Sequence, residues 1–383
     1  MGGVSMETYK LSDLCEILDA KRKPLSALQR AKKQGIYPYY GAQGIIDHLD
    51  EYLLDGEYLL VAEDGANLET RNQPIANIAK GKIWVNNHAH VLGSNGICPL
   101  NLLGFILNSM NISPYVTGCA QPKLNQENLR NIEIELPSHI DRIASILSSL
   151  DRKIELNNKI NADLEEMAQA IFKNWFVDFE PFKDGKFVNS ELGMIPEGWK
   201  VVAFDNILKV TTMKTGKEGI PEYSVTNTGI HPRDEKFTKN LSKSSAKNKL
   251  IRKGNLVFGM SREILNWGIM KEEVGGVSSA YNVYVVDENI VNSIYLECFI
   301  AQRMDYFADL IKPASREGQG VDKALLLKKI ICIPPSEIMD VFLEKYDSIM
   351  HLAEIRKRES SHLSLLRDTL LPRLMSGEIE VPE

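Results

Sequence analysis

The middle of this 383-residue chain carries a long stretch in which apolar residues recur at alternating steps of three and four. In residues 138–175 this spacing runs through Ile140, Ile143, Leu147, Leu150, Ile154, Leu164, Ala168, Ile171 and Trp175. Heptad spacing of this kind is typical of a long helix that buries a narrow stripe against a partner helix. Asn157 and Asn161 fall at stripe positions, where a buried asparagine lowers stability but fixes register. The stretch therefore predicts a spacer helix with a specified partner.

A second stretch, residues 336–371, has the same spacing, and Pro372 is expected to end it. Its seam residues are Ile338, Phe342, Ile349, Leu352, Leu363, Leu366 and Leu370, with Arg356 and Glu359 at the polar centre. A parallel pairing with the first helix would also match the polar centres, but the short connection through residues 176–198 favours an antiparallel pairing. Asn157 and Asn161 would then face Arg356 and Glu359. A helix of about 38 residues spans roughly 55 to 60 Å, which is about one and a half turns of B-DNA.

The sequence also repeats itself in order. A shift of 198 residues superposes Gly56 on Gly254, Leu60 on Phe258, Gln121 on Gln319 and Ile132 on Ile330. Repetition at a nearly constant offset indicates two copies of one structural unit. We expect an α+β fold in which two pseudo-symmetric mixed domains are separated by two long antiparallel coiled-coil helices. The expected division is 1–136 and 181–335 for the domains, 137–180 for the central helix, and 336–383 for the second helix and tail.

Shorter patterns predict the elements inside each domain. In the first domain, strands are expected at residues 58–62, 83–85, 89–92 and 132–136, and a helix at 99–110. In the second domain, strands are expected at residues 255–260, 281–287 and 330–333, and a helix at 293–312.

Composition limits the environment of the chain. The net charge of -6 counts against nucleic-acid binding, unless basic residues gather on one face. Five scattered cysteines without a CxxC pair favour a reducing cytoplasm and argue against a zinc site. The apolar run at residues 100–107 is far shorter than a membrane span, and the start of the chain lacks a signal-peptide pattern. We therefore expect a soluble, cytoplasmic protein that does not enter a membrane.

No catalytic motif is evident in the sequence. It contains neither a GxxxxGK[ST] phosphate loop nor a GxSxG nucleophile elbow, and it lacks the motifs of DNA methyltransferases. His88 and His90 would share one face of a strand, but without a third ligand candidate a structural role is favoured over a metal site. Asp178, Glu180 and Lys183 have the wrong spacing for a nuclease carboxylate set. We therefore expect a noncatalytic protein with no metal.

Three loops carry polar groups that could contact a ligand. They are residues 37–44, with Gln43 near the tip, residues 117–123 and residues 315–320. Glycines in these loops permit close backbone approach, glutamine and arginine suit base edges, and lysine suits phosphates. The alternative is that residues 37–44 form a turn with tyrosines packed on a sheet, and that the other two are solvated surface turns.

In five segments the chain resembles the specificity subunits of type I restriction-modification systems. Residues 172–182 (Phe-Lys-Asn-Trp-Phe-Val-Asp-Phe-Glu-Pro-Phe), followed by 193–199, resemble the central region of that family. Residues 370–379 resemble its C-terminal signature, and residues 39–44 and 117–121 resemble segments of its target recognition domains. The resemblance covers essentially the whole chain.

The resemblance implies a noncatalytic subunit in which each domain binds one half of a split, asymmetric sequence of double-stranded DNA. The paired helices would set the distance between the halves and dock two methyltransferase subunits, which restriction and translocase subunits would join. S-adenosylmethionine, ATP and magnesium would belong to those partners, and this chain would hold no cofactor. The second domain departs from the first, since it has Val225-Thr226-Asn227-Thr228 in place of the Tyr-Gly-Ala-Gln loop.

The candidate contact residues follow from these loops and their neighbours. For DNA they are Tyr40, Gly41, Gln43, Arg71, Gln121, Lys123, Arg262, Arg316 and Gln319. For helix pairing they are Leu150, Ile154, Asn157, Asn161, Leu164, Leu352, Arg356, Glu359 and Leu363. The alternative function is a coiled-coil scaffold with two protein-binding end domains.

Overall fold

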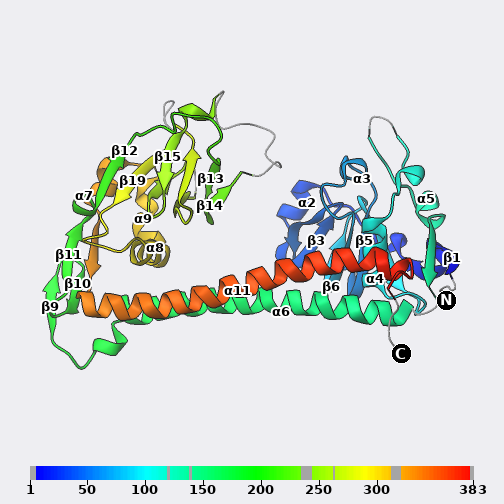
Figure 1. The fold of residues 1–383 in the computed structure, drawn as a ribbon, viewed down its shortest axis with the longest axis horizontal. Coiled ribbons are helices and arrows are strands. Elements are labelled where there is room, and N and C mark those ends of the chain that lie inside the picture. Colours follow the sequence, from blue (N-terminus) through cyan, green and yellow to red (C-terminus); the bar gives the residue numbers. More distant parts are fainter. Residues whose placement is uncertain are drawn as a thin grey trace. The chain divides into compact units, whose positions relative to one another are not determined.

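The computed structural model describes residues 6–118, 121–137, 140–233, 244–261, 264–311 and 321–379. Contacts divide the chain into two compact units (Figure 1). Unit 1 comprises Met1–Lys159 and Arg356–Glu383, and unit 2 comprises Ile160–Ile355. Each unit joins a sheet-rich part to segments of two long helices, α6 (Ile140–Phe176) and α11 (Ser336–Met375). The predicted α+β class is confirmed.

Unit 1 is built on a six-stranded sheet in the order β2-β7-β5-β6-β3-β4, with β1 paired to β8 beside it. The strands are β1 (Met6–Lys10), β2 (Cys15–Ile17), β3 (Gln34–Gly41), β4 (Gly44–Leu49), β5 (Leu54–Ala62), β6 (Ala76–Val85), β7 (Ala89–Ser94) and β8 (Glu133–Pro137). The α-helices are α1 (Leu11–Leu14), α2 (Ala27–Ala31), α3 (Asn67–Thr70), α4 (Leu100–Ser109) and α5 (Gln126–Arg130). Short 3-10 turns lie at Asp19–Lys21 and Ser113–Tyr115.

Unit 2 contains a four-stranded sheet in the order β12-β19-β16-β17 and several two-stranded pairs. Its strands are β9 (Phe187–Ser190), β10 (Gly193–Pro196), β11 (Lys200–Ala203), β12 (Leu208–Thr211), β13 (Tyr223–Thr226), β14 (Gly229–Pro232), β15 (Lys249–Arg252), β16 (Leu256–Phe258), β17 (Trp267–Ile269), β18 (Val274–Val277), β19 (Asn282–Val286) and β20 (Ile330–Ile333). The α-helices are α7 (Phe204–Ile207), α8 (Ser293–Gln302), α9 (Met304–Phe307) and α10 (Lys323–Lys328). Short 3-10 turns lie at Glu180–Phe182, Ser245–Lys247 and Ala308–Leu310.

The internal repeat appears as a shared strand order. The order β2-β7-β5-β6 in unit 1 recurs as β12-β19-β16-β17 in unit 2, and the pair β1-β8 recurs as β11-β20. Cys15 directly follows α1 and pairs with Ser94, as Leu208 directly follows α7 and pairs with Val286, so His90 corresponds to Asn282. Val61 lies opposite His90 and Phe258 opposite Asn282, so Val61 corresponds to Phe258. The sequence match of Leu60 with Phe258 is therefore wrong by one residue. A shift of one residue along a strand exchanges the two faces of the sheet. The short apolar runs contain no residue that distinguishes these faces, so the sequence alone does not fix the register.

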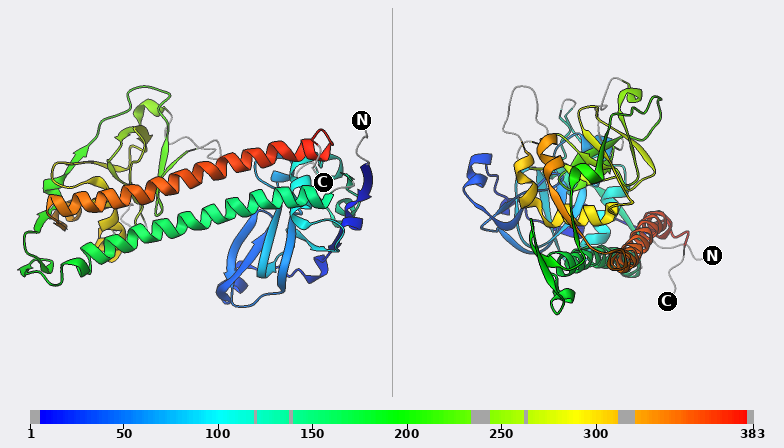
Figure 2. Two further views of the ribbon diagram at one scale, coloured as in Figure 1. Left: turned by 60° about the horizontal axis from the view of Figure 1, so that its bottom comes forward. Right: turned by 90° about the vertical axis from the view of Figure 1, so that its left-hand side faces the viewer.

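The two long helices run antiparallel, side by side (Figures 1 and 2). In unit 1, Arg367 bonds to Asp151 at 2.8 Å, and Asn157 Nδ2 donates to Glu359 Oε2 at 2.9 Å. In unit 2, Phe172 of α6 packs on Phe342 of α11, with ring centroids 5.7 Å apart. The predicted antiparallel pairing and the contact between Asn157 and Glu359 are both present. Within the described part of the chain, no helix combines the length and apolarity that crossing a membrane requires.

Most predicted seam residues are buried or half-buried, with two exceptions. Asn157 is fully buried, and Leu150, Ile154, Asn161, Leu164, Arg356, Glu359 and Leu363 are half-buried. Leu352 is 50% exposed, and Ala353 is buried at this level instead. Leu366 is likewise 46% exposed, so the predictions for Leu352 and Leu366 are both wrong; the buried stripe on α11 passes through Ala353 instead of Leu352.

Helix α11 continues past Pro372 to Met375, so the predicted stop at this proline is wrong. A proline in the last turn removes only one backbone hydrogen bond. Leu371 and Leu374 are both buried in the core of unit 1, and this packing keeps the last turn helical. The predicted helix at residues 293–312 is also interrupted, since α8 ends at Gln302 and the chain turns at Arg303. The turn buries Phe307 against Phe299 and Phe204.

Each sheet-rich part completes its core with the long helices. The main core of unit 1 includes Ile143 and Leu147 of α6 and Leu371 and Leu374 of α11. The main core of unit 2 includes Phe172 and Phe176 of α6 and Phe342 and Tyr346 of α11, packed on Tyr295 and Trp199. The helices are therefore part of both folding units.

Replacing Asn157 with leucine should raise the free energy of unfolding by about 1 kcal/mol. Its Oδ1 is buried without a hydrogen-bond partner among the described residues, so the amide carries a desolvation penalty that leucine removes. Urea denaturation of the full chain measures the change. Leu156→Ala is the matched control, because Leu156 is 50% exposed and should shift stability by less than about 0.5 kcal/mol. A less stable Asn157→Leu chain would contradict this account of the polar layer.

Candidate nucleic-acid interface

The residues 39–44 form the tip of the hairpin between β3 and β4. Gly41 pairs with Gly44 across a two-residue turn, Ala42 and Gln43, in which the Gln43 side chain is exposed. Gly44 adopts a φ of +123°, which the absence of a Cβ permits. Tyr39 is buried in the sheet, and Tyr40 is half-buried, which raises the pKa of its hydroxyl. The hairpin thus combines both interpretations, since its tyrosines pack on the sheet while Gln43 faces solvent.

The loop of residues 117–123 is closed by two backbone hydrogen bonds between its ends, Thr117 N to Lys123 O at 2.8 Å and Lys123 N to Thr117 O at 2.7 Å. Gly118 has a φ of +91°, and a Cβ there would lie 2.5 Å from the carbonyl oxygen of Gln121. The loop therefore requires glycine at this position. Gln121 and Lys123 are exposed, with Cys119 outside the described residues.

A chain of hydrogen bonds connects the hairpin to this loop. Asn86 N donates to Tyr40 O at 3.0 Å, and His88 N donates to Asn86 Oδ1 at 2.8 Å. Glu63 N then donates to His88 O at 2.9 Å, and Leu124 N donates to Glu63 O at 2.8 Å. Hydrogen bonds of Asn86, His88 and Glu63 thus connect the two predicted segments of unit 1. The sequence did not single out these three residues as DNA contacts.

Arg71 has a structural role. It adopts a left-handed φ of 52°, and its Nη2 donates to the carbonyl oxygens of Leu107 and Asn108 at 2.9 and 2.7 Å. These carbonyls end α4, where a positive charge is favourable. Because its guanidinium caps a helix, Arg71 is not among the proposed interface residues, and its contact with DNA stays a prediction.

In unit 2, the predicted contact residues Arg262, Arg316 and Gln319 lie outside the described residues. The hairpin of β13 and β14 occupies the place in the element order that the β3–β4 hairpin has in unit 1. Its tip, Asn227 and Thr228, is exposed, and the Thr228 hydroxyl lies 2.9 Å from His231 Nε2. A side-chain amide, that of Gln43 or Asn227, thus lies at the tip of each hairpin.

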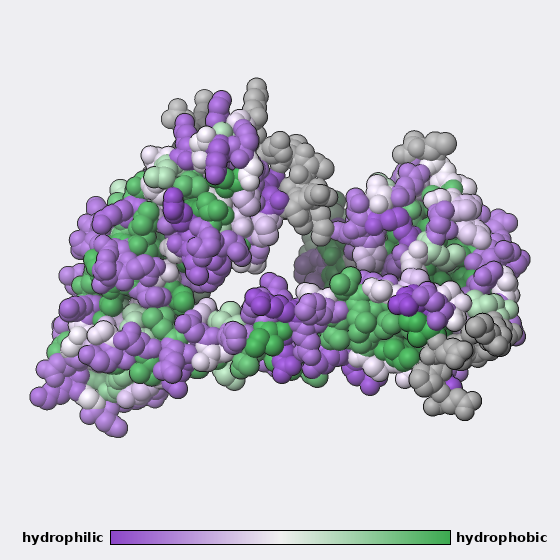
Figure 3. All heavy atoms as spheres, viewed as in Figure 1, coloured by the Kyte–Doolittle hydropathy of each residue, from purple (hydrophilic) through white to green (hydrophobic). Residues whose placement is uncertain are grey.

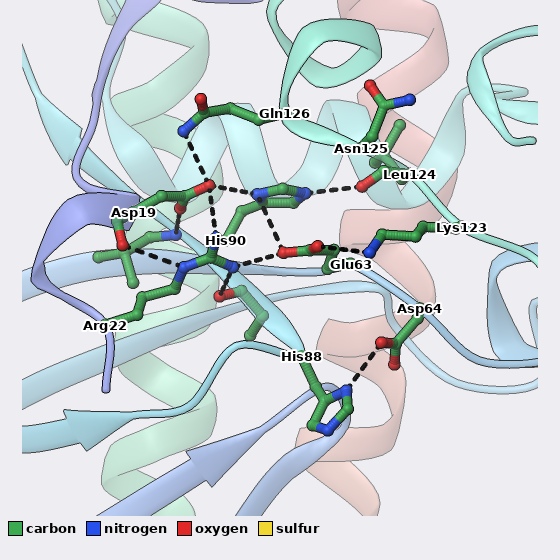
Figure 4. A network of polar contacts seen from close by, with 12 residues as sticks. Asp19, Arg22, Glu63, Asp64, His88, His90, Lys123, Leu124, Asn125 and Gln126 are labelled. Carbon is green, nitrogen blue, oxygen red and sulfur yellow. Dashed lines mark hydrogen bonds and ion pairs between the residues drawn. The ribbon is translucent and has the colours of Figure 1, made fainter. Parts of the chain in front are cut away.

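A buried polar network lies beside the loop of residues 117–123 in unit 1 (Figure 4). Asp19, Glu63 and His90 bring their ligand-type atoms within 4.8 Å of one another. Arg22 bonds to Glu63 at 2.5 Å and to Asp19 at 3.1 Å, and Lys123 bonds to Glu63 at 3.1 Å. Arg22 and Lys123 therefore share the oxygen atoms of these two carboxylates with His90.

Hydrogen-bond donors and cations around the two carboxyl groups lower the pKa of each. Burial alone would raise the pKa of Asp19, but hydrogen bonds from His90 and Val91 and the charge of Arg22 outweigh it and lower that pKa. Burial likewise opposes ionisation of Glu63, whose pKa is nevertheless lowered by Arg22 and Lys123. His88 lies apart and pairs with Asp64 at 2.7 Å. The two histidines predicted on one face therefore have separate partners.

The described cysteines do not form a reactive site. Cys15, Cys98, Cys298 and Cys332 are free and buried. Burial raises the thiol pKa to about 11 for Cys98 and to about 12 for the other three. Such thiols stay protonated at neutral pH, so they are poor nucleophiles and poor metal ligands.

The long helices also expose apolar side chains. On α6 these include Leu156 and Met167, and on α11 Val341, Leu352, Ile355, Leu365 and Leu366. Figure 3 shows hydrophobic residues at the surface of the helices within each unit.

Comparison with known proteins gives consistent matches. A family model described as the type I restriction modification DNA specificity domain matches residues 3–166. The specificity subunit of the type I restriction enzyme MjaIX from Methanocaldococcus jannaschii is 27% identical, over 85% of this chain and 80% of its own. A putative type I restriction enzyme specificity subunit from Haemophilus influenzae, S.HindORF215P, is also 27% identical, over 87% and 84%. In fold, the chain is similar to the S subunit of a type I restriction-modification system from M. genitalium, with a TM-score of 0.51, 13% identity and coverage of 100% and 98%.

Replacing Gly118 with alanine should open the loop of residues 117–123, because the new Cβ cannot avoid the carbonyl of Gln121. Hydrogen–deuterium exchange of the Thr117 and Lys123 amides should become at least about tenfold faster, which corresponds to ~1.4 kcal/mol of lost protection. The matched control is Gly96→Ala, since Gly96 has a similar φ of +84° but open space around it. Equal exchange in the two variants would contradict the requirement for close approach at Gly118.

Proposed function

The chain belongs to the family of DNA specificity subunits of type I restriction-modification systems, and we propose that each unit recognises one half of a split DNA sequence. Specificity subunits are noncatalytic, which agrees with the absence of catalytic motifs from the sequence. In unit 1 the proposed contacts are Tyr40, Gly41 and Gln43 of the hairpin and Gln121 and Lys123 of the loop. In unit 2 they are Arg262, Arg316 and Gln319, together with Asn227 at the hairpin tip.

The observation that supports this proposal is the repetition of one strand order with different side chains at matched places. Gln43 lies at the hairpin tip of unit 1, whereas Asn227 lies at that of unit 2. Amide side chains can bond to the edges of adenine through a donor and an acceptor at once. Two units with the same strand order but different residues at their hairpin tips are expected to recognise two half-sites of different sequence.

Charge has a specific role in this proposal. The chain carries a net charge of -6, so its affinity for DNA has to come from local groups and from partners. Lys123 is 51% exposed, although it is paired with Glu63, and it would contact phosphate while Gln121 contacts a base. We therefore expect the chain to bind its target tightly only in a complex.

Two methyltransferase subunits and the restriction and translocase subunits are the proposed partners, and the cytoplasm is the proposed compartment. The exposed apolar side chains of α6 and α11 would dock the methyltransferase subunits. S-adenosylmethionine would bind to those subunits, and ATP and magnesium to the translocase subunits. Nothing in the proposal requires a cofactor in this chain.

Selection from a random duplex library tests recognition by the purified chain with its methyltransferase subunit. The selected duplexes should contain two specific blocks separated by a non-specific spacer of fixed length. Gln43→Ala and Gln121→Ala should each weaken preference in one block by about tenfold, and Asn227→Ala should affect the other block. Gln34→Ala, an exposed position at the far end of β3, is the control. Selection of no split sequence would overturn the proposal and favour a protein-binding scaffold.

We also propose that the length of the paired helices sets the spacer between the two blocks. Inserting four residues into α6 and four into α11 at matched seam positions adds about 6 Å, which equals roughly two base pairs. The spacer in the selected duplexes should therefore lengthen by about two base pairs. A spacer of unchanged length, with both blocks still selected, would show that the helices do not set it.

A further inference from the structure

The side chain of His90 lies at the centre of the polar network and is completely buried (Figure 4). Its Nδ1 lies 2.6 Å from Asp19 Oδ2, and its Nε2 lies 2.7 Å from the carbonyl oxygen of Leu124. His90 therefore spans from the turn that carries Asp19 to the residue that directly follows the loop of residues 117–123. It is the one side chain in the described part of the network that bonds to the backbone of Leu124.

Both groups that face the ring act as acceptors. A backbone carbonyl oxygen can only accept, so Nε2 must donate to Leu124. Asp19 receives hydrogen bonds from Val91 N at 2.9 Å and Gln126 Nε2 at 3.1 Å, and Arg22 lies 3.1 Å away. Surrounded by donors, this carboxyl group is ionised and can only accept, so Nδ1 must donate as well. A neutral imidazole has a single N–H, and two donated bonds require the imidazolium form.

The charges around the ring balance this assignment. Asp19 and Glu63 supply two negative charges, and Glu63 Oε2 lies 3.8 Å from His90 Nδ1. Arg22, Lys123 and the imidazolium supply three positive charges, of which that of Lys123 is half exposed to solvent. Asp19, Glu63, Arg22 and His90 are therefore neutral together when His90 carries both protons, while the ammonium group of Lys123 adds one positive charge at the surface. Buried charges are tolerated when they are paired in this way.

We propose that His90 is a positioning residue that holds the DNA-contacting loop of unit 1 through a charged hydrogen-bond bridge from Asp19 to Leu124. This inference rests on the proposed function and extends it. The bridge holds the backbone at Leu124, directly after the loop that presents Gln121 and Lys123. The Glu63 carbonyl accepts from Leu124 N, and the Glu63 carboxylate pairs with the Lys123 ammonium group. Unit 2 has Asn282 at the matched register, so the bridge would act on one half of the target alone.

Nitrogen-15 NMR of the full chain labelled at histidine tests the protonation state directly. At neutral pH both ring nitrogens of His90 should give the signals of protonated nitrogens, identified by their loss in His90→Gln. In Asp19→Asn, the new amide can donate to Nδ1, so only Nε2 should remain protonated. A single protonated nitrogen at His90 in the unaltered chain would overturn the proposal, whether or not the chain binds DNA.

Duplex selection with the methyltransferase complex tests the consequence for recognition. His90→Gln should reduce preference in the block read by unit 1 by about tenfold and leave the other block unchanged. Asp19→Asn keeps a bond to Leu124 and should reduce that preference less. His88→Gln alters only the side chain paired with Asp64 and keeps the backbone bonds of residue 88 to Asn86 and Glu63, so it is the matched control and should change neither block. An equal loss in both blocks would show general destabilisation and overturn the positioning role, whereas absence of any split sequence with the unaltered chain would refute the proposed function itself.

Discussion

The packing of α6 against α11 is the interaction on which the rest of the chain depends. Each helix carries a narrow apolar stripe, and a helix of this composition gains most of its stability from burying that stripe. The stripes end in the cores of the two units, where Leu147 and Leu371 pack in unit 1 and Phe172 and Phe342 in unit 2. A sheet-rich part without its helix segments would expose these core contacts. Folding of the recognition surfaces and pairing of the helices are therefore one process.

The polar side chains between α6 and α11 fix the register of the two helices. A fully apolar seam would tolerate sliding by a heptad, because leucine and isoleucine pack in many arrangements. Asn157 bonded to Glu359, and Lys153 at 3.5 Å from the same carboxylate, allow a single register. The hydrogen bond to Asn157, together with the charges of Arg356 and Lys153, lowers the pKa of Glu359 despite partial burial. If helix length sets the spacer, as we propose, a unique register serves the chain more than the stability that an apolar layer would add.

The sequence was informative where the signal is periodic or repeated. The heptad stripe located both helices and placed Asn157 opposite Glu359, and the repeat predicted two units before any strand order was known. The misses have physical causes. Hydrophobicity places Leu352 in the seam, but Ala353 is the buried residue. Pro372 predicts the end of the helix, but burial of Leu371 and Leu374 keeps the last turn helical.

The polar network around His90 could not be assembled from the sequence. Asp19, Glu63 and Leu124 are far from His90 along the chain. The pairing of β7 with β5 and the backbone bonds from Leu18 to Val91 and from Leu124 to Glu63 bring them together. The pair His88 and His90 was visible as a pattern, but the pattern gives neither residue a partner. Similarly, Arg71 has the residue type of a DNA contact, and only the three-dimensional structure reveals its bonds to the end of α4.

The central claim is that this one chain determines a DNA target with two separate halves. The most direct measurement is sequencing of methylated adenines in the DNA of cells that express the chain with its methyltransferase subunit, and of the same cells without the chain. The account predicts one split motif with a spacer of constant length, methylated only when the chain is present. A continuous motif, or a methylation pattern that does not depend on the chain, would contradict it.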